Sequence, residues 1–267
     1  MNIHPTAIVA PGAKLGVDVE VGPFSIIEDG AVLGDRCRIG PHVMICGNTT
    51  LGDDCEVHMG AALGDAPQDI SYKNEKSYVR IGNRARIREH VTVHRGTAVD
   101  SATVIGDDCF LMALSHVAHN CHLGNRVILG NNVLLAGHVT VEDRVIISGG
   151  CAVHQFVRVG TLAFFGGGVR VNKDVPPYMT VNNDNTISMF NVVGLRRAGF
   201  NDAARAGVKA AFQKLYRSGL NLSQALAAIE STEVCPEVRY LLDFIHASKR
   251  GVCSSHSTHA QGGAIEE

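Results

Sequence analysis

A repeat of six residues runs through the first two-thirds of this 267-residue chain. Reading every sixth residue from position 3 to position 171 gives 29 positions, and 27 of them carry an aliphatic residue or phenylalanine; the exceptions are Asp69 and Glu75. A period of six fits neither a helix nor a single alternating strand, but it fits short parallel strands joined by tight corners around a solenoid axis. Three such strands close one coil, so residues that lie three hexads apart in the sequence are expected to stack on adjacent coils.

The interior of this solenoid is predicted from a second position of the repeat. The fourth residue after most of the aliphatic positions is small, and we expect it to point inward beside the aliphatic side chain. Five of the eight cysteines occupy this position: Cys37, Cys55, Cys109, Cys121 and Cys151. None of them lies in the C-x-x-C spacing that is typical of metal sites, so the sequence predicts inert thiols in the core.

Breaks in the repeat predict the domain organisation. Residues 64–77 interrupt the pattern, which then resumes in phase, so we interpret 65–80 as a loop that leaves the solenoid and takes up three hexads, one whole coil. Consecutive prolines at 176 and 177 end the solenoid, because proline cannot donate to a strand ladder. From about Ile187 the pattern becomes helical, with helices expected over 203–216, 222–229 and 238–245. The predicted fold is therefore mainly β, with a β-helix over 1–174, a small helical domain over 175–250 and a disordered tail over 251–267.

Charge and hydropathy argue against a protein that recruits nucleic acid through a global basic field and against a membrane-spanning protein. The chain has 24 Lys and Arg against 26 Asp and Glu, so no global basic field recruits nucleic acid. We find neither a secretory leader nor an apolar run long enough to cross a bilayer, so no stable membrane insertion and a cytoplasmic location are expected.

The coil arithmetic also brings polar side chains together. Moving three hexads on from 119 leads to 137, and moving three more leads to 155. The column predicted along one edge of the prism consists of His119, Gly137, His138, His154 and Gln155, with His116 beside it. A titratable cluster on an apolar solenoid is a candidate site. A zinc site is an alternative, but His116, His119 and His122 splay over a corner without an adjacent carboxylate, so no metal is expected.

Two arginines should stack in the same way. Arg126 and Arg144 are separated by three hexads. The two arginines can be explained as part of an ordinary solvated face. The more specific alternative is that they form a docking surface for an acidic partner.

Several motifs together resemble the UDP-N-acetylglucosamine O-acyltransferase family, whose members catalyse the first step of lipid A synthesis. Besides the hexads, these motifs are Ala66-Pro-Gln-Asp69, Ile87-Arg-Glu-His-Val-Thr-Val-His-Arg-Gly-Thr97, Phe110-Leu-Met112, His116-Val-Ala-His119, Leu135-Ala-Gly-His138, Ala152-Val-His-Gln-Phe156, Asp174-Val-Pro-Pro-Tyr178 and Gly194-Leu-Arg-Arg-Ala-Gly-Phe200. The resemblance implies a left-handed parallel β-helix of hexapeptide repeats with a C-terminal helical domain. It also implies a homotrimer with sites between subunits.

The activity implied by the resemblance is transfer of a β-hydroxyacyl chain from acyl carrier protein to the 3-position of a UDP-amino sugar, without a cofactor. His119 would act as general base without a covalent acyl-enzyme, since an imidazole is suited to take a proton from a sugar hydroxyl. The backbone N–H of Gly137 would stabilise the oxyanion. The substrate-binding residues implied are Asp69, His116, His138, His154, Gln155, Asn191 and Arg197. Gly167 would lie in the acyl-chain groove, and we expect Arg126 and Arg144 to dock the carrier protein.

Four positions depart from the family pattern, and all except Asn120 touch the acceptor site, so the acceptor sugar stays open. Asn120 stands where an acid is common, Ser71 where a lysine is common, Val193 where an acid is expected, and Ala198 shortens the arginine pair. UDP-N-acetylglucosamine and a 3-amino analogue are both compatible with them. Other readings are an N-acyltransferase of the same superfamily, a γ-type zinc carbonic anhydrase and a non-enzymatic scaffold. The sister lipid A enzyme has an extra N-terminal domain, for which a first hexad at Ile3 leaves no room.

Overall fold

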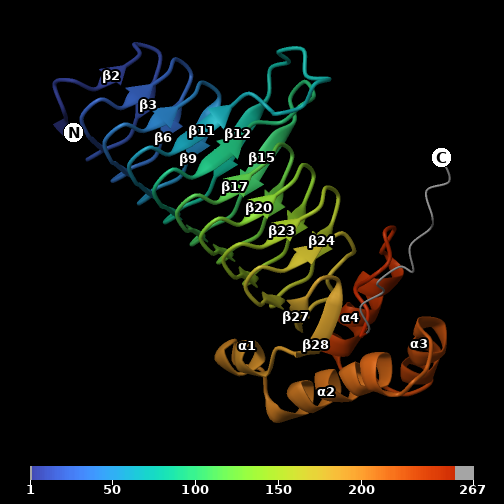
Figure 1. Cartoon of the computed structure of the whole chain (residues 1–267). Helices are drawn as coiled ribbons and strands as arrows, with labels where there is room; N and C mark the ends of the chain where they lie inside the picture. Colours follow the sequence, from blue (N-terminus) through green and yellow to red (C-terminus); the bar gives the residue numbers. More distant parts are fainter. Residues whose placement is uncertain (1, 256–267) are drawn as a thin grey trace, which may run out of the picture.

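The computed structural model describes residues 2–255, which form a left-handed parallel β-helix with a helical domain at its C-terminal end (Figure 1). Three sheets make the sides of the prism. Sheet A contains β1 (Asn2–Ile3), β4 (Glu20–Val21), β7 (Arg38–Ile39), β10 (Glu56–Val57), β13 (Arg86–Ile87), β16 (Phe110–Leu111), β19 (Ile128–Leu129), β22 (Ile146–Ile147), β25 (Phe164–Phe165), β27 (Met179–Asn183) and β28 (Thr186–Phe190). Sheet B contains β2 (Ile8–Val9), β5 (Ile26–Ile27), β8 (Met44–Ile45), β11 (Ala62–Asp65), β14 (Thr92–His94), β17 (His116–Val117), β20 (Leu134–Leu135), β23 (Ala152–Val153) and β26 (Arg170–Val171). Sheet C contains β3 (Lys14–Leu15), β6 (Val32–Leu33), β9 (Thr49–Leu51), β12 (Tyr78–Ile81), β15 (Ala102–Ile105), β18 (His122–Leu123), β21 (Thr140–Val141) and β24 (Arg158–Val159).

The core follows the two positions predicted from the repeat. From the second coil onward, most of the hexad aliphatics are almost fully buried, and the five cysteines at the small position have no exposed surface. Their thiols donate hydrogen bonds to carbonyls of the next coil, as from Cys37 Sγ to Gly52 O at 3.1 Å and from Cys121 Sγ to Ala136 O at 3.1 Å. Burial raises the pKa of Cys121 to about 12, and the prediction that these thiols lie in the core is confirmed.

Tight corners join the sheets, and most of them place one residue in the left-handed region. Asn120, Arg126 and His138 are examples, with φ of 59°, 58° and 59°. We name the corners by the sheets that they join. The BC edge includes residues 66–77, 95–101, 118–121, 136–139 and 154–157, and the CA edge includes residues 34–37, 52–55, 82–85, 106–109, 124–127 and 142–145.

The interruption of the repeat is two loops, so the prediction of one loop worth a whole coil was wrong. Glu56 of β10 pairs with Arg86 of β13, whereas a regular coil would place Asn74 there, so the first loop adds two hexads. Arg86 pairs with Phe110 of β16 rather than with Val104, so a second loop adds one hexad. The first loop also ends earlier than predicted, because β12 begins at Tyr78. Val99, counted as a core position, lies in the second loop and is 68% exposed.

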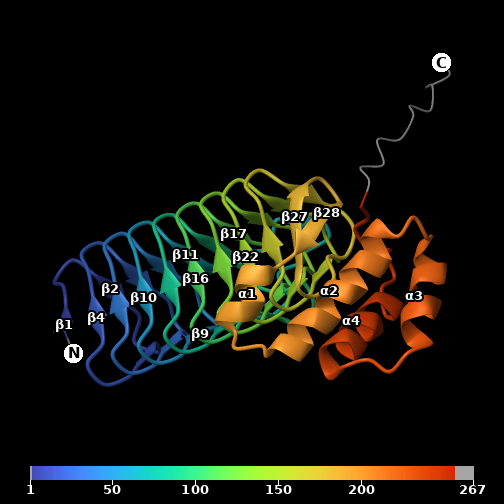
Figure 2. The same ribbon diagram turned by 90° about the horizontal axis from the view of Figure 1, so that it is seen from below.

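The C-terminal end differs from the prediction in two places. Residues 186–190 form β28, antiparallel to β27, and the helices begin only at α1 (Val192–Arg197). The predicted helices are confirmed as α2 (Asp202–Arg217), α3 (Leu222–Glu230) and α4 (Pro236–His246), which cover the last coils (Figure 2). The tail was expected to be disordered from 251, but Val252 and Ser254 pair with Asp174 and Thr186 because the last strands offer free backbone groups. The rest of that predicted tail, from residue 256, lies outside the described residues.

No helix within residues 2–255 has both the length and the apolar character needed to cross a bilayer.

Candidate active site

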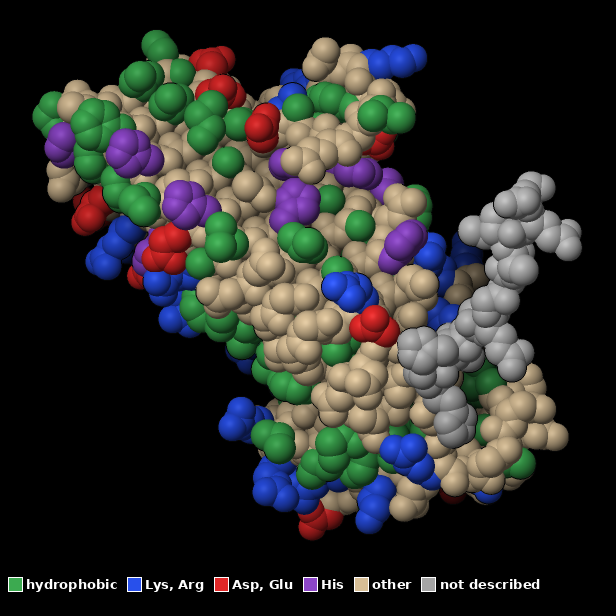
Figure 3. All heavy atoms as spheres, in the orientation of Figure 1, with side chains coloured by type: hydrophobic (Ala, Val, Ile, Leu, Met, Phe, Trp, Pro, Cys, Tyr) green, Lys and Arg blue, Asp and Glu red, His purple; other side chains and the backbone are tan. Residues whose placement is uncertain are grey.

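The candidate site lies on the BC edge, at the point where both loops leave the β-helix. The loops connect β11 to β12 and β14 to β15, and the next two corners of the same edge carry His119 and Gly137. Histidine side chains gather on this face beside the projecting loop (Figure 3). The stacking predicted from the repeat is present, since His138 N donates to His119 O at 3.0 Å and Phe156 N donates to Gly137 O at 3.1 Å.

The His119 ring is held between its own corner and the long loop. Its Nδ1 lies 3.0 Å from Asn120 Oδ1, and its Nε2 lies 3.9 Å from Asp69 Oδ2. The side chain is 13% exposed, so one nitrogen is engaged inside the protein while the other faces the loop carboxylate. This geometry leaves Nε2 available to accept a proton from a bound hydroxyl or amine.

Gly137 is close to the imidazole because it has no side chain. A Cβ at this position would lie 2.4 Å from Cε1 and 2.5 Å from Nε2 of His119. Within residues 2–255, nothing accepts a hydrogen bond from the Gly137 N–H. The equivalent N–H groups of the CA edge from Asp35 to Asn125 all donate to side chains. A free donor at this position of a corner is therefore not imposed by the coil, although other corners, such as those at Asn131 and Gln155, share it within residues 2–255.

The long loop is fixed in place by polar contacts. Asp69 Oδ1 accepts hydrogen bonds from Ser71 N at 2.8 Å and Ser71 Oγ at 2.7 Å. These bonds, with smaller contributions from His119 and His138, hold the pKa of Asp69 below its usual range. Arg95, from the second loop, donates to Tyr72 Oη at 3.0 Å and to Gly64 O at 2.9 Å. The second loop thus supports the first.

The histidines around His119 favour their neutral forms. Burial, with the neighbouring His94 and His119, lowers the pKa of His116 to about 4. Its Nδ1 lies 2.7 Å from Thr92 Oγ1, and its ring meets that of His94 edge to face. Burial also lowers the pKa of His94 and that of His138. A neutral imidazole can accept a hydrogen bond or a proton, which a charged one cannot.

His138 and His154 mark two further sides of the site. The His138 ring stacks on Phe156 at 4.7 Å and meets His119 edge to face at 5.2 Å. His154 lines a cavity of about 740 Å³ on the outer face of sheet B together with His116. Arg250, from the segment that follows α4, places Nη2 3.3 Å from His154 Nδ1.

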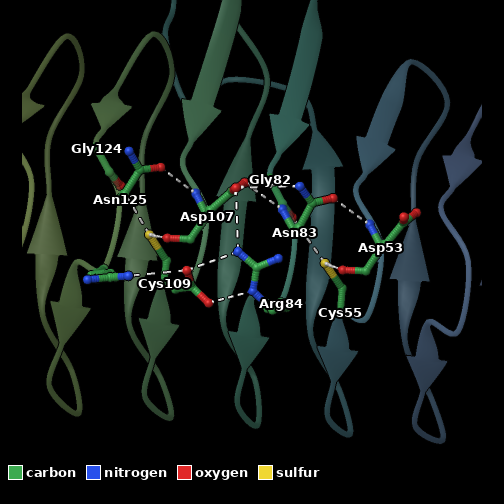
Figure 4. Close-up of polar contacts among 11 residues, drawn as sticks. Asp53, Cys55, Gly82, Asn83, Arg84, Asp107, Cys109, Gly124 and Asn125 are labelled. Atoms are coloured by element: carbon green, nitrogen blue, oxygen red, sulfur yellow. Dashed lines mark hydrogen bonds and ion pairs between the residues drawn. The ribbon is translucent and has the colours of Figure 1, made fainter.

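The CA edge carries a ladder of side chains that repeats from coil to coil (Figure 4). Asp53 N donates to Asn83 Oδ1 at 2.9 Å, and Asp107 N donates to Asn125 Oδ1 at 2.9 Å. The neighbouring corner positions alternate in charge, with bidentate pairs between Arg36 and Asp54 and between Arg84 and Asp108.

Arg126 and Arg144 end this alternation with two adjacent cations. Arg126 lies 4.0 Å from Asp108, which is already bound by Arg84. Both arginines line a cavity of about 700 Å³ between sheet A and α1. Asn191 and Arg197 line the same cavity, so the structure brings the predicted docking and nucleotide residues together. Asn191 also caps α1 by accepting from Gly194 N at 2.8 Å and donates to Leu162 O at 2.8 Å.

The other predicted residues lie apart from His119. Gln155 occupies the coil above Gly137 and is exposed, while Gly167 lies at an AB corner. A Cβ on Gly167 would contact only Gly149 O, at 3.6 Å, so this corner is open to side chains. Val193 is 58% exposed.

Several site residues could not be inferred from the hexads. Thr97, Ser71, Gln68 and Arg250 come from loops or from the C-terminal segment, and Phe156 stacks on His138 only through the shape of the corner. Across residues 2–255, no three His, Cys, Asp or Glu side chains converge so as to hold a metal ion.

Comparison with known proteins identifies relatives over most of the chain. Residues 174–253 match a family described as Udp N-acetylglucosamine O-acyltransferase, Domain 2, and residues 30–65 and 102–137 match bacterial transferase hexapeptide repeats. The acyl-[acyl-carrier-protein]--UDP-N-acetylglucosamine O-acyltransferase of Ectopseudomonas mendocina is 46% identical over 254 residues, covering 94% of this chain and 98% of the relative. The enzyme of the same name from Halorhodospira halophila is 44% identical over 254 residues, with the same coverage.

Solved structures are also similar to this chain over most of its length. The UDP-N-acetylglucosamine acyltransferase of Bacteroides fragilis is 38% identical and has a TM-score of 0.90, covering 93% of this chain and 98% of that one. The Francisella novicida enzyme is 34% identical and has a TM-score of 0.89, covering 99% of both chains. The similarity therefore extends over the β-helix and the helical domain together.

Proposed function

This chain belongs to the UDP-N-acetylglucosamine O-acyltransferase family, and from that premise we propose that it transfers a β-hydroxyacyl chain from acyl carrier protein to the 3-position of a UDP-amino sugar. The observation that carries this proposal is the arrangement at the BC edge. An imidazole with one nitrogen engaged faces a loop carboxylate, and a free backbone N–H lies on the coil above it.

In the proposed reaction His119 is the general base. Its Nε2 takes the proton of the acceptor hydroxyl or amine while that atom attacks the carbonyl carbon of the acyl thioester. The new bond forms from the acceptor to this carbon, and the Gly137 N–H stabilises the oxyanion. The C–S bond then breaks, and the imidazolium returns its proton to the leaving sulfur, which gives the free thiol of the carrier protein. No covalent acyl-enzyme is needed.

We assign the acceptor to the surroundings of Asp69 and His138, with His116, His154 and Gln155 on the neighbouring surface. Asp69 is kept ionised by Ser71, so it accepts hydrogen bonds from a sugar hydroxyl or amine. A lysine at position 71 would pair with the loop carboxylate instead. The acceptor at the 3-position is therefore either a hydroxyl, giving an ester, or an amine, giving an amide.

We further propose that sites form between copies of the chain in a homotrimer. His119 and Gly137 lie on the BC edge, whereas Asn191 and Arg197 lie over sheet A, on another side of the prism. The outer face of sheet B carries exposed apolar side chains that suit a subunit interface: Ile8, Ile26 and Leu134 are 62%, 38% and 46% exposed. Arg197 of one copy would then bind the phosphates of a nucleotide held by another.

Complementation between two inactive chains tests the shared site. Co-expressed His119→Ala and Arg197→Ala chains should regain about a quarter of the wild-type activity in random hybrids, because a quarter of the interfaces join two intact halves. Activity no higher than that of either variant alone would contradict sites built from two copies.

Mass spectrometry of the products tests the function itself. The protein is mixed with β-hydroxyacyl carrier proteins and, separately, with UDP-N-acetylglucosamine or its 3-amino analogue. An acylated sugar nucleotide is expected with one of the two acceptors, and an ester is distinguished from an amide by its loss in alkali. Absence of both products with every donor would overturn the proposal.

A further inference from the structure

The second loop touches the catalytic corner through one oxygen atom. Asn120 Oδ1 accepts hydrogen bonds from Thr97 N at 3.1 Å and from Thr97 Oγ1 at 2.9 Å. The same oxygen lies 3.0 Å from His119 Nδ1. Thr97 belongs to the extra hexad that follows β14, so this contact is not part of the regular coil.

The contact decides how the Asn120 amide is oriented. The oxygen and nitrogen of an amide have nearly the same shape, and the bonds they make distinguish them. A backbone N–H can only donate, so the atom that faces Thr97 N must be the oxygen. That oxygen also faces His119 Nδ1, and an acceptor there requires Nδ1 to carry the proton. The lone pair of the neutral ring is then on Nε2, on the side of Asp69 and Gly137.

We propose that Thr97 and Asn120 are positioning residues that hold neutral His119 as the Nδ1–H tautomer, so that Nε2 is the base. This inference rests on the proposed function for its catalytic consequence. An asparagine beside a catalytic histidine is productive only in this orientation, because the opposite one donates to Nδ1 and leaves the proton on Nε2. In a Ser-His-Asp triad, an error of this kind lowers kcat by about 10⁴-fold. A carboxylate at position 120 would accept the Nδ1–H hydrogen bond in either orientation. The Asn120 amide accepts it only because Thr97, from the second loop, fixes the orientation of the amide.

The amide differs from a carboxylate in charge. Asn120 fixes the tautomer but stabilises the imidazolium formed during transfer less than a carboxylate would. The charged or titratable groups that face His119 are Asp69 from the long loop, His138 from the coil above, His116 from the preceding strand β17 and His94 from the coil below. Of these only Asp69 is anionic, and it approaches Nε2 rather than Nδ1.

Four variants and one control test the proposal. Asn120→Gly removes the amide without strain, since φ is 59° at this position, and we expect kcat to fall by about 100-fold with both KM values changed by less than about two-fold. Asn120→Asp should keep kcat within about ten-fold and move the acidic limb of the pH–rate profile to higher pH, because the carboxylate favours the imidazolium. Thr97→Val, which removes the hydroxyl that donates to Asn120, should lower kcat, whereas Thr97→Ser, which keeps a hydroxyl, should have a kcat close to that of the wild type. Asn132→Gly is the matched control, with φ of 58° at a corner of another edge, and should change nothing.

A spectroscopic measurement tests the tautomer independently of the reaction. In protein labelled with ¹⁵N-histidine, the His119 signals are assigned by their loss in His119→Gln. Above the pH at which histidines titrate, the wild type should show a protonated Nδ1, and Asn120→Gly should show protonated Nε2 in a substantial share of molecules. Protonated Nε2 in the wild type, or an unchanged kcat in Asn120→Gly, would overturn the proposal. If the spectra agree and no acyl transfer is found, the proposed function fails and the tautomer assignment stands.

Discussion

At the scale of single residues, His119 lies outside the aliphatic core but has a central place in the proposed chemistry. Its ring lies at a corner, outside the aliphatic core, so truncation leaves the coil packed. We expect His119→Ala to lower the rate of transfer by about 100-fold or more. The melting temperature should stay within a few degrees of the wild type. Retention of more than about a tenth of the wild-type rate would exclude a role as general base.

His116 links the site to the stability of the fold. The folded protein holds its pKa at about 4, below the ordinary value of 6.5, so the unfolded chain binds more protons between these two values. The free energy of unfolding should therefore fall as the pH drops from about 6.5 to 4, by at most about 3 kcal/mol for this group. Urea titrations at pH 7 and pH 4.5 should show a smaller loss in His116→Gln than in the wild type. An equal loss in both proteins would assign the effect to other groups.

The sequence predicts the positions of some of these residues in the fold far better than those of others. His119 and Gly137 can be placed on adjacent coils by arithmetic, because parallel backbone hydrogen bonds fix the register of every coil. Thr97 and Arg250 cannot be placed in this way. Their positions depend on how a loop and the C-terminal segment pack, and those contacts join residues with no fixed spacing.

At the scale of elements, the two loops show that the period of the repeat does not predict how many loops interrupt it. Together they add three hexads, the length of one coil, so the repeat resumes in phase as it would after one longer loop. Val99 is apolar and falls in phase, yet it is exposed, because phase alone carries no information about burial. The helices of the C-terminal domain were predicted from their apolar periodicity, which is local to each segment. Their first turns are stabilised locally as well, since Asn201 and Asn221 each accept from a backbone N–H there.

The open AB corner at Gly167 is the candidate determinant of acyl-chain length. We propose that the acyl chain passes this corner, so a long β-hydroxyacyl donor is expected, of about 12 to 14 carbons by resemblance to the family. Gly167→Met should then shift the preference to shorter donors. The reason is steric, because overpacking costs about 1 to 3 kcal/mol, similar to the gain from burying one to three methylenes. Relative kcat/KM for donors of different length measures the shift, and Gly167→Ala is the mild control. Equal loss with every donor would show that Gly167 does not limit chain length. Phe164, which lines the cavity beside α1, would then be the next candidate, whereas Phe165 is fully buried in the core.

At the scale of the whole molecule, the alternation of arginine and aspartate along the CA edge ends at its C-terminal coils. Arg126 and Arg144 are adjacent there at the rim of the cavity, where we propose that acidic carrier protein docks. Reversing both to Glu should raise the KM for the carrier protein with little change in kcat, and the wild-type KM should rise with salt. Reversal of Arg38 and Arg239, which lie elsewhere on the surface, is the control with the same change in net charge. An unaltered KM would leave Arg126 and Arg144 as solvated surface.

The unequal ends of the β-helix have a consequence for how it opens. Each coil touches only the coils before and after it, so local unfolding must begin at an end. The C-terminal end is covered by β28, by the helices and by the bridges of Val252 and Ser254, whereas Ile3 and Ile8 at the other end are 39% and 62% exposed. Amide hydrogen exchange should therefore proceed as a one-sided fraying, fastest in the first coil and slower with each coil toward the covered end. The loops and His119 lie part-way along this gradient, so strands on their N-terminal side can exchange while the catalytic corner remains closed.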